Sequence, residues 1–300
     1  MQTKGPNWAL LAVLLGAIGI GFAPIWVRLS ETGPTATAFW RVTIALPLLW
    51  LRAKPVPQKP WLMIAASGFL FAADLTLWHW SLKLTTVTNS TLLSNLAPLF
   101  VTLAAHWLFH EKITRLFMVG LFLGIAGMAV LVGKSFQFGN VKGDLLAVLT
   151  AVFYGGYLLS VKQLRREMEP VTVMMWSGLF SSPCFLIVAV LSGDTLVPAS
   201  VHGWIIVAAL AVVSHIGGQT LIAYALGRLP ASFSSITLLL QPAVAALLAW
   251  PILGEPVTMR QVIGGVIILA GIALAHLQLS SRHADNTVEA NYERRGNRDL

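Results

Sequence analysis

Polar side chains that could bind a small solute occur inside otherwise apolar segments of this chain. In the segment 61–82, Asp74, Trp78 and Ser81 share one helical face at positions i, i+4 and i+7. A carboxylate in such surroundings either binds an amine or exchanges protons, or it is a hydrogen-bonded residue between helices, and both alternatives stay open for Asp74. His79, nearer the end of the same segment, is interpreted as a gate or substrate contact, with a packing histidine as the alternative.

Two other apolar segments carry Pro98 and Pro242 near their middles. Because a proline leaves the carbonyl four residues earlier without its amide partner, the carbonyls of Ser94 and Leu238 are predicted to be free. Such breaks can bind the zwitterionic end of an amino acid, although polar contacts between helices explain them nearly as well. The polar side chains expected to line the breaks are Ser90, Ser94, Asn95, Ser234 and Gln241.

Two tyrosines and a histidine complete the candidate substrate site. Tyr154 and Tyr157 fall on one face of the segment 143–163, and His215 and Gln219 lie one turn apart in the segment 203–226. Aromatic walls suit a planar or apolar substrate, but an aromatic stripe is about twice as often core packing as a binding site.

Three charged residues are given structural roles. Arg41 lies well inside an apolar segment, where it must pair or snorkel, and a lock with a carboxylate or carbonyl is favoured over substrate contact. Glu111 and Glu255 each follow an apolar segment. They are predicted to form pairings between domains that break and reform. Pro98 and Pro242 complete this structural set.

The composition defines the solvent of the protein. Of the 300 residues, 56% are hydrophobic and 11% are charged, a surface that water could not solvate. The apolar runs are about 20 residues long, enough for a helix to cross a hydrocarbon core about 30 Å thick, and they lack the alternation of a barrel strand. The prediction is therefore an all-α membrane protein with about ten transmembrane helices, at 8–28, 35–52, 61–82, 87–108, 113–132, 143–163, 171–191, 203–226, 231–252 and 259–278.

Charge and cysteine content exclude several classes of protein. The net charge is +8, but the basic residues lie in loops between apolar segments, which indicates membrane orientation and not nucleic-acid binding. Their excess on alternate loops predicts that both termini are cytoplasmic. The single cysteine, Cys184, excludes an internal disulfide and a thiolate metal cage, and neither a cofactor nor a metal is expected.

The chain contains an internal repeat of five predicted helices. An odd number of crossings places the second copy upside down relative to the first, as in carriers that expose a central site to each face in turn. The predicted domains are 1–140, 141–279 and a disordered cytoplasmic tail, 280–300. A shift of 144 residues superposes Pro98 on Pro242, Glu111 on Glu255, Thr114 on Thr258, Gly120 on Gly264 and Gly127 on Gly271.

Short motifs add a family resemblance. AFWRVTIALPLL, WSL followed by NLAPLF, and the helix-ending HEKIT and GEPVT occur in this order. With the doubled unit, they make the chain similar to the EamA family of the drug/metabolite transporter superfamily, and to its aromatic amino acid exporters. One departure is His110 before Glu111, where the second copy has Gly254 before Glu255.

The resemblance implies a carrier in a bacterial inner membrane. Its expected partners are the lipid bilayer and a small amino acid-like molecule, without nucleic acid, and it would export aromatic and other neutral amino acids. A proton-coupled multidrug or metabolite exporter is the alternative, and a membrane-embedded enzyme or a channel comes next. The protein is expected to be a monomer or homodimer, because a ridge of Gly120, Gly124 and Gly127 either holds the core together or joins two subunits.

Overall fold

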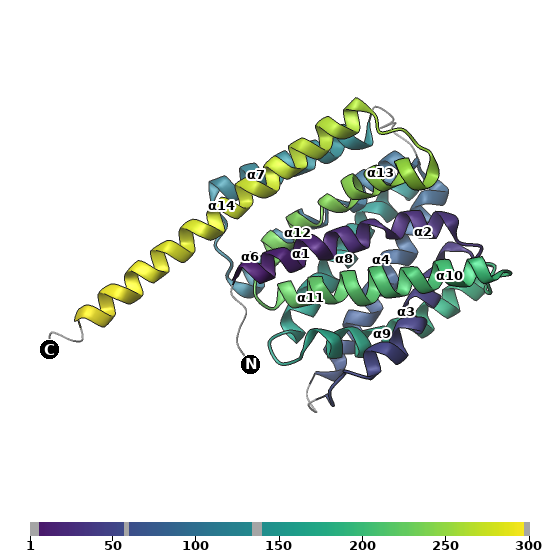
Figure 1. The fold of residues 1–300 in the computed structure, drawn as a ribbon, viewed down its shortest axis with the longest axis horizontal. Helices are drawn as coiled ribbons and strands as arrows, with labels where there is room; N and C mark the ends of the chain where they lie inside the picture. Colours follow the sequence, from purple (N-terminus) through teal and green to yellow (C-terminus); the bar gives the residue numbers. More distant parts are fainter. Residues whose placement is uncertain (1–5, 57–59, 134–139, 297–300) are drawn as a thin grey trace.

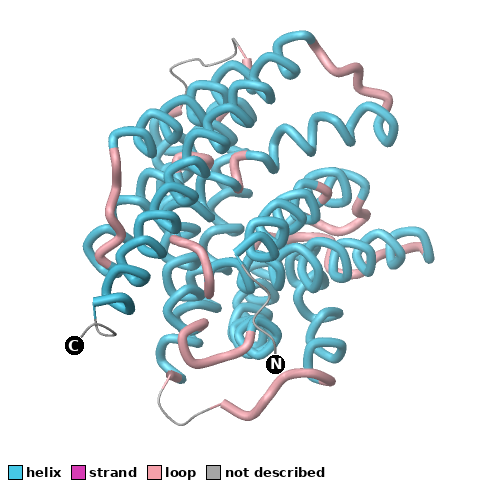
Figure 2. Tube along the Cα trace, turned by 60° about the vertical axis from the view of Figure 1, so that its left-hand side comes forward, coloured by secondary structure: helices cyan, strands magenta, loops and turns pink. Residues whose placement is uncertain are grey.

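The computed structural model describes residues 6–56, 60–133 and 140–296, and the regular elements in these ranges are all helices (Figure 2). Figure 1 labels most of them along the chain. Their bounds are α1 Pro6–Gly21, α2 Ala23–Leu29, α3 Pro34–Trp50, α4 Trp61–Leu84, α5 Val87–Ser94, α6 Ala97–Phe109, α7 Arg115–Val132, α8 Val141–Leu164, α9 Pro170–Leu191, α10 Val201–Ala209, the π-helix η1 Leu210–Gln219, α11 Thr220–Leu226, α12 Ala231–Thr237, α13 Leu240–Leu253 and α14 Met259–Gly296.

The helices combine into the membrane spans that the sequence predicts. Nine segments within the described ranges are apolar and at least 18 residues long, and four of these join two or three consecutive helices. Helix α3 coincides with the remaining predicted span and is 17 residues long. The prediction of an all-α membrane protein is confirmed. Helix α14 continues to Gly296, where the sequence suggests a disordered tail.

Besides the one-residue gap between α1 and α2, three predicted spans are interrupted, which the apolar pattern alone does not indicate. Helix α5 ends at Ser94 before α6 begins at Ala97, and α12 ends at Thr237 before α13 begins at Leu240. Both breaks lie beside the central prolines, as expected. The carbonyl of Leu238 is not free, however, because it accepts a hydrogen bond from the Gln241 amide at 3.0 Å. The third interruption is η1, the π-helix in the span 201–226.

Equivalent spans of the two halves pack against each other across the molecule. Helix α3 packs on α9, α6 on α12, and α7 on α14. Other contacts between the halves follow the same symmetry. Helix α4, the third span of the first half, packs on α8, the first span of the second half. In the same way α1, the first span of the first half, packs on η1 and α11 in the third span of the second half. In Figure 1, α7 and α14 lie side by side at one edge of the bundle. This arrangement is the pseudo-two-fold symmetry that a repeat of five spans predicts.

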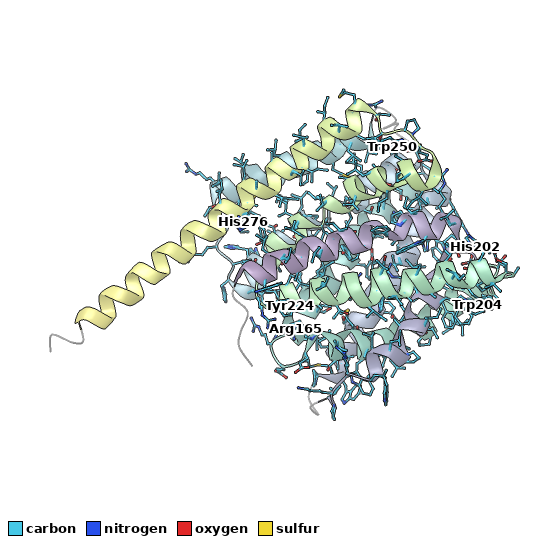
Figure 3. The ribbon with its side chains drawn as sticks, viewed as in Figure 1. Arg165, His202, Trp204, Tyr224, Trp250 and His276 are labelled. Carbon is cyan, nitrogen blue, oxygen red and sulfur yellow. The ribbon has the colours of Figure 1, made fainter. Side chains whose placement is uncertain are left out.

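The ends of equivalent helices lie at opposite ends of the bundle. Arg165, after α8, and Trp250, near the end of α13, are far apart along the helix axes in Figure 3. Glu111, which follows α6, contacts Lys162, one turn before Arg165. Helices α6 and α13 are repeat equivalents, so one half is inverted relative to the other. We call the two ends the Lys162 end and the Arg28 end.

The glycine ridge of α7 is used inside the chain. A Cβ atom added to Gly120 would lie 2.6 Å from the Gly271 carbonyl oxygen, and one added to Gly127 would lie 2.8 Å from the Gly264 carbonyl oxygen. These four glycines therefore let the α7 and α14 backbones touch, which is the close packing that helices in lipid favour. Of the two roles expected for this ridge, the structure shows the one within the core.

A matched pair of alanine substitutions tests this contact. In Gly264→Ala the new methyl group would lie 2.5 Å from the Leu131 amide nitrogen, whereas in Gly265→Ala it meets only the Ala243 Cβ at 3.8 Å. We expect Gly264→Ala to lower the free energy of unfolding by about 1–3 kcal/mol because the backbones must separate. Thermal unfolding of purified protein in detergent measures both variants. Equal unfolding midpoints would contradict the packing described.

The two repeat-equivalent helix ends have the same backbone geometry despite their different residues. His110 after α6 has φ 54° and Gly254 after α13 has φ 70°. The next amides then bond back in the same way, Glu111 to the Ala105 carbonyl and Glu255 to the Ala249 carbonyl, each at 3.3 Å. The left-handed turn aims each glutamate back across the bundle.

Because a side chain in the left-handed region costs about 1–2 kcal/mol, His110→Gly is expected to stabilise the protein by about 1 kcal/mol. The measurement is the unfolding midpoint in detergent. The reciprocal variant Gly254→Ala should lower it. A fall in stability for His110→Gly would show that the imidazole contributes more than the backbone strain removes.

Candidate functional site

A small polar cavity lies between the two broken helices. Its volume is about 20 Å³, enough for one water molecule. Tyr154 and Gln241 lie in its wall, and the Gln241 Nε2 atom is buried without a hydrogen-bond partner among the described residues. Both halves contribute to the wall, which consists of Ser94, Asn95, Ala97, Pro98, Tyr154, Leu158, Ser235, Leu238, Leu239 and Gln241.

The structure thus brings together five residues that the sequence singles out, Ser94, Asn95, Pro98, Tyr154 and Gln241. Pro242 adjoins the same wall through Gln241 and is partly buried. Sequence reasoning missed Ser235, which is one residue from the predicted Ser234. Counting helical positions back from Pro242 assumes an unbroken helix, and the break at Leu238 shifts which serine faces the cavity.

A second cluster surrounds the ring of Phe71. The Arg41 guanidinium lies 5.8 Å from the centre of this ring, and the Tyr157 and His215 rings lie 4.9 and 5.9 Å from it. Tyr157 stacks in turn on Tyr154 at 6.2 Å, so the cluster adjoins the cavity. Phe71 is absent from the sequence-based candidates, although it lies three residues before Asp74 and hence on the same helical face.

Arg41 and Asp74 are two ionisable residues buried at this cluster. Arg41 is 5% exposed and Asp74 is 6% exposed. No ion pair joins them among the described residues, and the Nε and Nη2 atoms of Arg41 are buried there without a hydrogen-bond partner. These two nitrogens therefore lack the direct contact that the expected structural lock requires.

His215 and Gln219 lie on the inner side of the π-helix. His215 is 2% exposed and Gln219 is 3% exposed, and both imidazole nitrogens and the Gln219 Oε1 atom have no partner in the described part of the chain. The neighbouring Ser214 hydroxyl donates to the Gly19 carbonyl at 2.7 Å and fixes η1 against α1. A π-helical turn in a longer helix is rare and occurs mostly at functional sites.

The other predicted substrate contacts lie outside the cavity wall. The Ser90 hydroxyl is hydrogen-bonded to Ser81, and the Ser234 hydroxyl donates to the Pro230 carbonyl at 2.9 Å. Trp78 packs on His79, with 5.3 Å between ring centres. His79 is buried in the second half of α4. Its proposed role as a gate stays a prediction.

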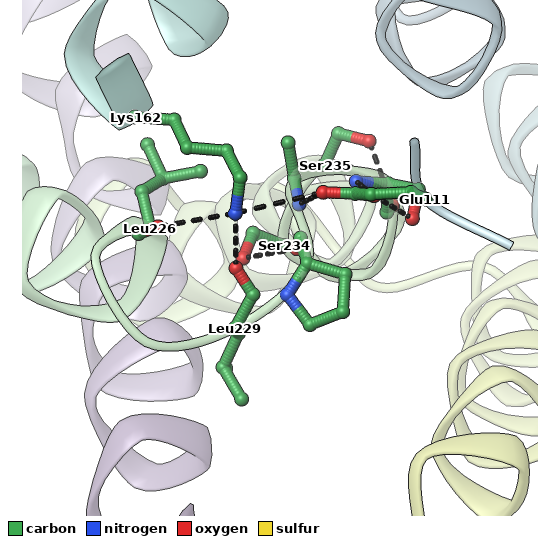
Figure 4. A network of polar contacts seen from close by, with 9 residues as sticks. Glu111, Lys162, Leu226, Leu229, Ser234 and Ser235 are labelled. Atoms are coloured by element: carbon green, nitrogen blue, oxygen red, sulfur yellow. Dashed lines mark hydrogen bonds and ion pairs between the residues drawn. The ribbon is translucent and has the colours of Figure 1, made fainter. Parts of the chain in front are cut away.

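Glu111 closes the Lys162 end of the interface between the halves (Figure 4). Its carboxylate lies 3.5 Å from the Lys162 ammonium and accepts hydrogen bonds from the Ala231 and Ser232 amides at 2.7 and 3.1 Å. It thereby caps the start of α12. Lys162 also donates to the Leu229 carbonyl at 2.8 Å. The Lys162 and Glu111 side chains are only 16% and 10% exposed.

The repeat-equivalent pair at the other end is exposed. Arg28 forms an ion pair with Glu255, and these side chains are 63% and 48% exposed. Carboxylates join the halves elsewhere at this end. Asp194 accepts from the Thr35 amide at 2.9 Å, and Glu31 accepts from Ser200, whose hydroxyl and amide hold the pKa of Glu31 below its ordinary value.

Glu111 and Glu255 each contact a base of the other half. That these pairings break and reform stays a prediction. Sequence reasoning missed the bases. The repeat carries the signal, because Arg28 and Lys162 both lie at the end of the first span of their half.

These features define a class of protein. Inverted halves, polar groups gathered at helix breaks in mid-span, and charged pairs between the halves at both ends are the architecture of a multi-pass membrane carrier. The EamA-like transporter family matches the chain twice, over residues 7–133 and 141–277. The chain belongs to this family, a family of transporters and not of enzymes.

Individual relatives are similar along almost their whole length. A probable terminal-alkyne amino-acid exporter of Streptantibioticus cattleyicolor is 28% identical, covering 95% of this chain and 98% of its own. A pseudopaline exporter of Pseudomonas aeruginosa is 23% identical, covering 89% of this chain and 95% of its own length. A solved crystal structure has the same fold, with a TM-score of 0.75, 19% identity and coverage of 91% and 97%.

The unequal burial of the two glutamate pairs predicts unequal effects of isosteric substitution. Glu111→Gln leaves the Lys162 charge buried, so we expect it to lower the free energy of unfolding by about 3 kcal/mol. Glu255→Gln removes an exposed ion pair and should lower the free energy of unfolding by less than about 1 kcal/mol. Unfolding midpoints in detergent compare them, and the double variant Glu111→Gln/Lys162→Met should recover most of the loss. Similar midpoints for the two single variants would contradict this account.

Proposed function

We propose that this transporter exports small amphipathic metabolites, chiefly aromatic and other neutral amino acids, by alternating access. The observation that carries the proposal is the cavity between the breaks after α5 and α12, to which the two inverted halves contribute equivalent segments. A central site shared by equivalent, inverted halves can open to either face when the halves exchange conformations.

The two glutamate pairs support alternating closure. At the Lys162 end the pair is buried, and that end is closed, whereas the equivalent pair at the Arg28 end is exposed. Exchange of the two half conformations would bury the Arg28 pair and open the Lys162 pair. We assign the Lys162 end and both termini to the cytoplasm of a bacterial inner membrane, so that the described conformation is closed toward the cytoplasm.

The chemistry around the cavity supports the substrate class. The Tyr154, Tyr157 and Phe71 rings provide flat apolar surface, and Arg41 provides a buried guanidinium group. A neutral amino acid combines an apolar body with a carboxylate. The names of the Streptantibioticus and Pseudomonas relatives describe exporters, the first of an amino acid, and so favour this class over an unrelated drug.

One observation favours a second candidate, a proton-coupled multidrug or metabolite exporter. Asp74 is buried, and no lysine or arginine follows it on its own helix before Lys83. It is therefore available to carry a proton. We favour uncoupled facilitation, because Asp74, His79 and His215 are the groups through which protons would have to pass, and no hydrogen-bonded path joins them among the described residues.

The test uses purified protein in liposomes loaded with unlabelled phenylalanine. We expect saturable uptake of external labelled phenylalanine, the counterflow that distinguishes a carrier from a channel. Asp74→Asn should keep downhill amino acid efflux within about twofold of the wild type, since the substitution is isosteric and uncoupled export needs no proton on this residue. Loss of downhill flux in a variant that keeps its unfolding midpoint would favour the proton-coupled alternative.

A further inference from the structure

The two unpartnered nitrogens of Arg41 lie on the same edge of its guanidinium group. Nε–H and the adjacent N–H of Nη2 point the same way and form a fork whose spacing matches the two oxygens of a carboxylate. The structure leaves both nitrogens buried and without a hydrogen-bond partner in the described ranges. An unmade hydrogen bond to a buried charged donor is expensive, so this edge requires an acceptor that the described chain does not supply.

The surroundings of Arg41 favour a ligand over a protein partner. The guanidinium lies near the face of Phe71, which stabilises its charge but satisfies no N–H group. Asp74 is also buried, yet it forms no ion pair with Arg41 in the described chain. The Arg41 fork therefore stays open to the carboxylate of a ligand.

Other unpartnered polar atoms gather around the same cluster. Among the described residues, His215 has two ring nitrogens without partners, and Gln219 and Gln241 each have one such amide atom. Buried polar atoms without partners are rare in folded proteins. Together with Arg41 they come from three spans, which indicates that a polar molecule completes the hydrogen bonding there.

We propose that Arg41 binds the carboxylate of the exported substrate, with its Nε and Nη2 atoms donating to the two carboxylate oxygens. The proposal deepens the proposed function and rests on it. The rings of Phe71 and Tyr157 are assigned to the apolar body of the substrate. Since the present cavity holds about 20 Å³, the halves must separate for the substrate to enter.

The experiment compares three probes that differ in their charged groups. Phenylalanine has both groups, 3-phenylpropionate has only the carboxylate, and 2-phenylethylamine has only the ammonium group. In phenylalanine counterflow with the wild type, we expect 3-phenylpropionate to compete and 2-phenylethylamine to compete at least about tenfold less well, because the amine leaves the Arg41 fork unpaired.

Arg41→Gln should raise the half-saturating phenylalanine concentration by about 10- to 150-fold and remove the preference for 3-phenylpropionate over 2-phenylethylamine. Arg41→Lys keeps the charge but not the fork. Its half-saturating phenylalanine concentration should lie between those of the wild type and Arg41→Gln. Arg115→Gln, which removes an exposed arginine at the start of α7, is the control and should behave as the wild type.

A second readout separates binding from folding. In the wild type, 3-phenylpropionate should raise the unfolding midpoint more than 2-phenylethylamine does. In Arg41→Gln this difference between the acid and the amine should disappear. Equal competition by the amine and the acid in the wild type, or an unchanged preference in folded Arg41→Gln, would overturn the assignment while leaving amino acid export intact. Absence of saturable phenylalanine exchange in the wild type would instead overturn the proposed function and the assignment with it.

Discussion

Inside a bilayer, each backbone amide and carbonyl group must find a partner within the protein, and this constraint shapes the whole structure. It explains why the described elements are helices, and why the places where the helices are interrupted matter. The breaks after Ser94 and Thr237 and the π-helix η1 all occur within spans and face the interior. The cavity and the unpartnered polar side chains lie beside them, because interrupted backbone is tolerated where it lines a cavity or packs against protein.

The inverted repeat makes the two ends of the protein chemically equivalent, but the described conformation gives them different environments. Glu111 is packed against the start of α12 and shielded from solvent, whereas Glu255 is half exposed. The difference is a property of the arrangement of the halves, since both glutamates follow the same left-handed turn. Two arrangements related by symmetry have similar packing energies, which makes their exchange feasible for a carrier.

The sequence predicts the spans and the repeat well because both depend on local composition and on spacing along the chain. It locates Asn95 and Gln241 because Pro98 and Pro242 lie beside the two breaks, and Tyr154 because of its spacing along a helical face. It does not predict that Lys162 pairs with Glu111 or that Phe71 lies between Arg41 and His215. Those contacts join different spans, and their geometry depends on how the helices pack and, for His215, on a π-helical turn that leaves no simple pattern.

The burial of Arg41 and Asp74 is difficult to explain by stability alone. Moving a charge from water into a protein interior costs several kcal/mol, and even a buried ion pair in direct contact is often no more stable than apolar residues of the same size. In the described ranges no ion pair joins Arg41 to Asp74, and the Arg41 Nε and Nη2 atoms have no hydrogen-bond partner, so the described conformation lacks even that compensation. The arrangement makes physical sense when a ligand of complementary charge supplies the missing contacts, so that binding energy offsets the cost that folding alone leaves uncompensated.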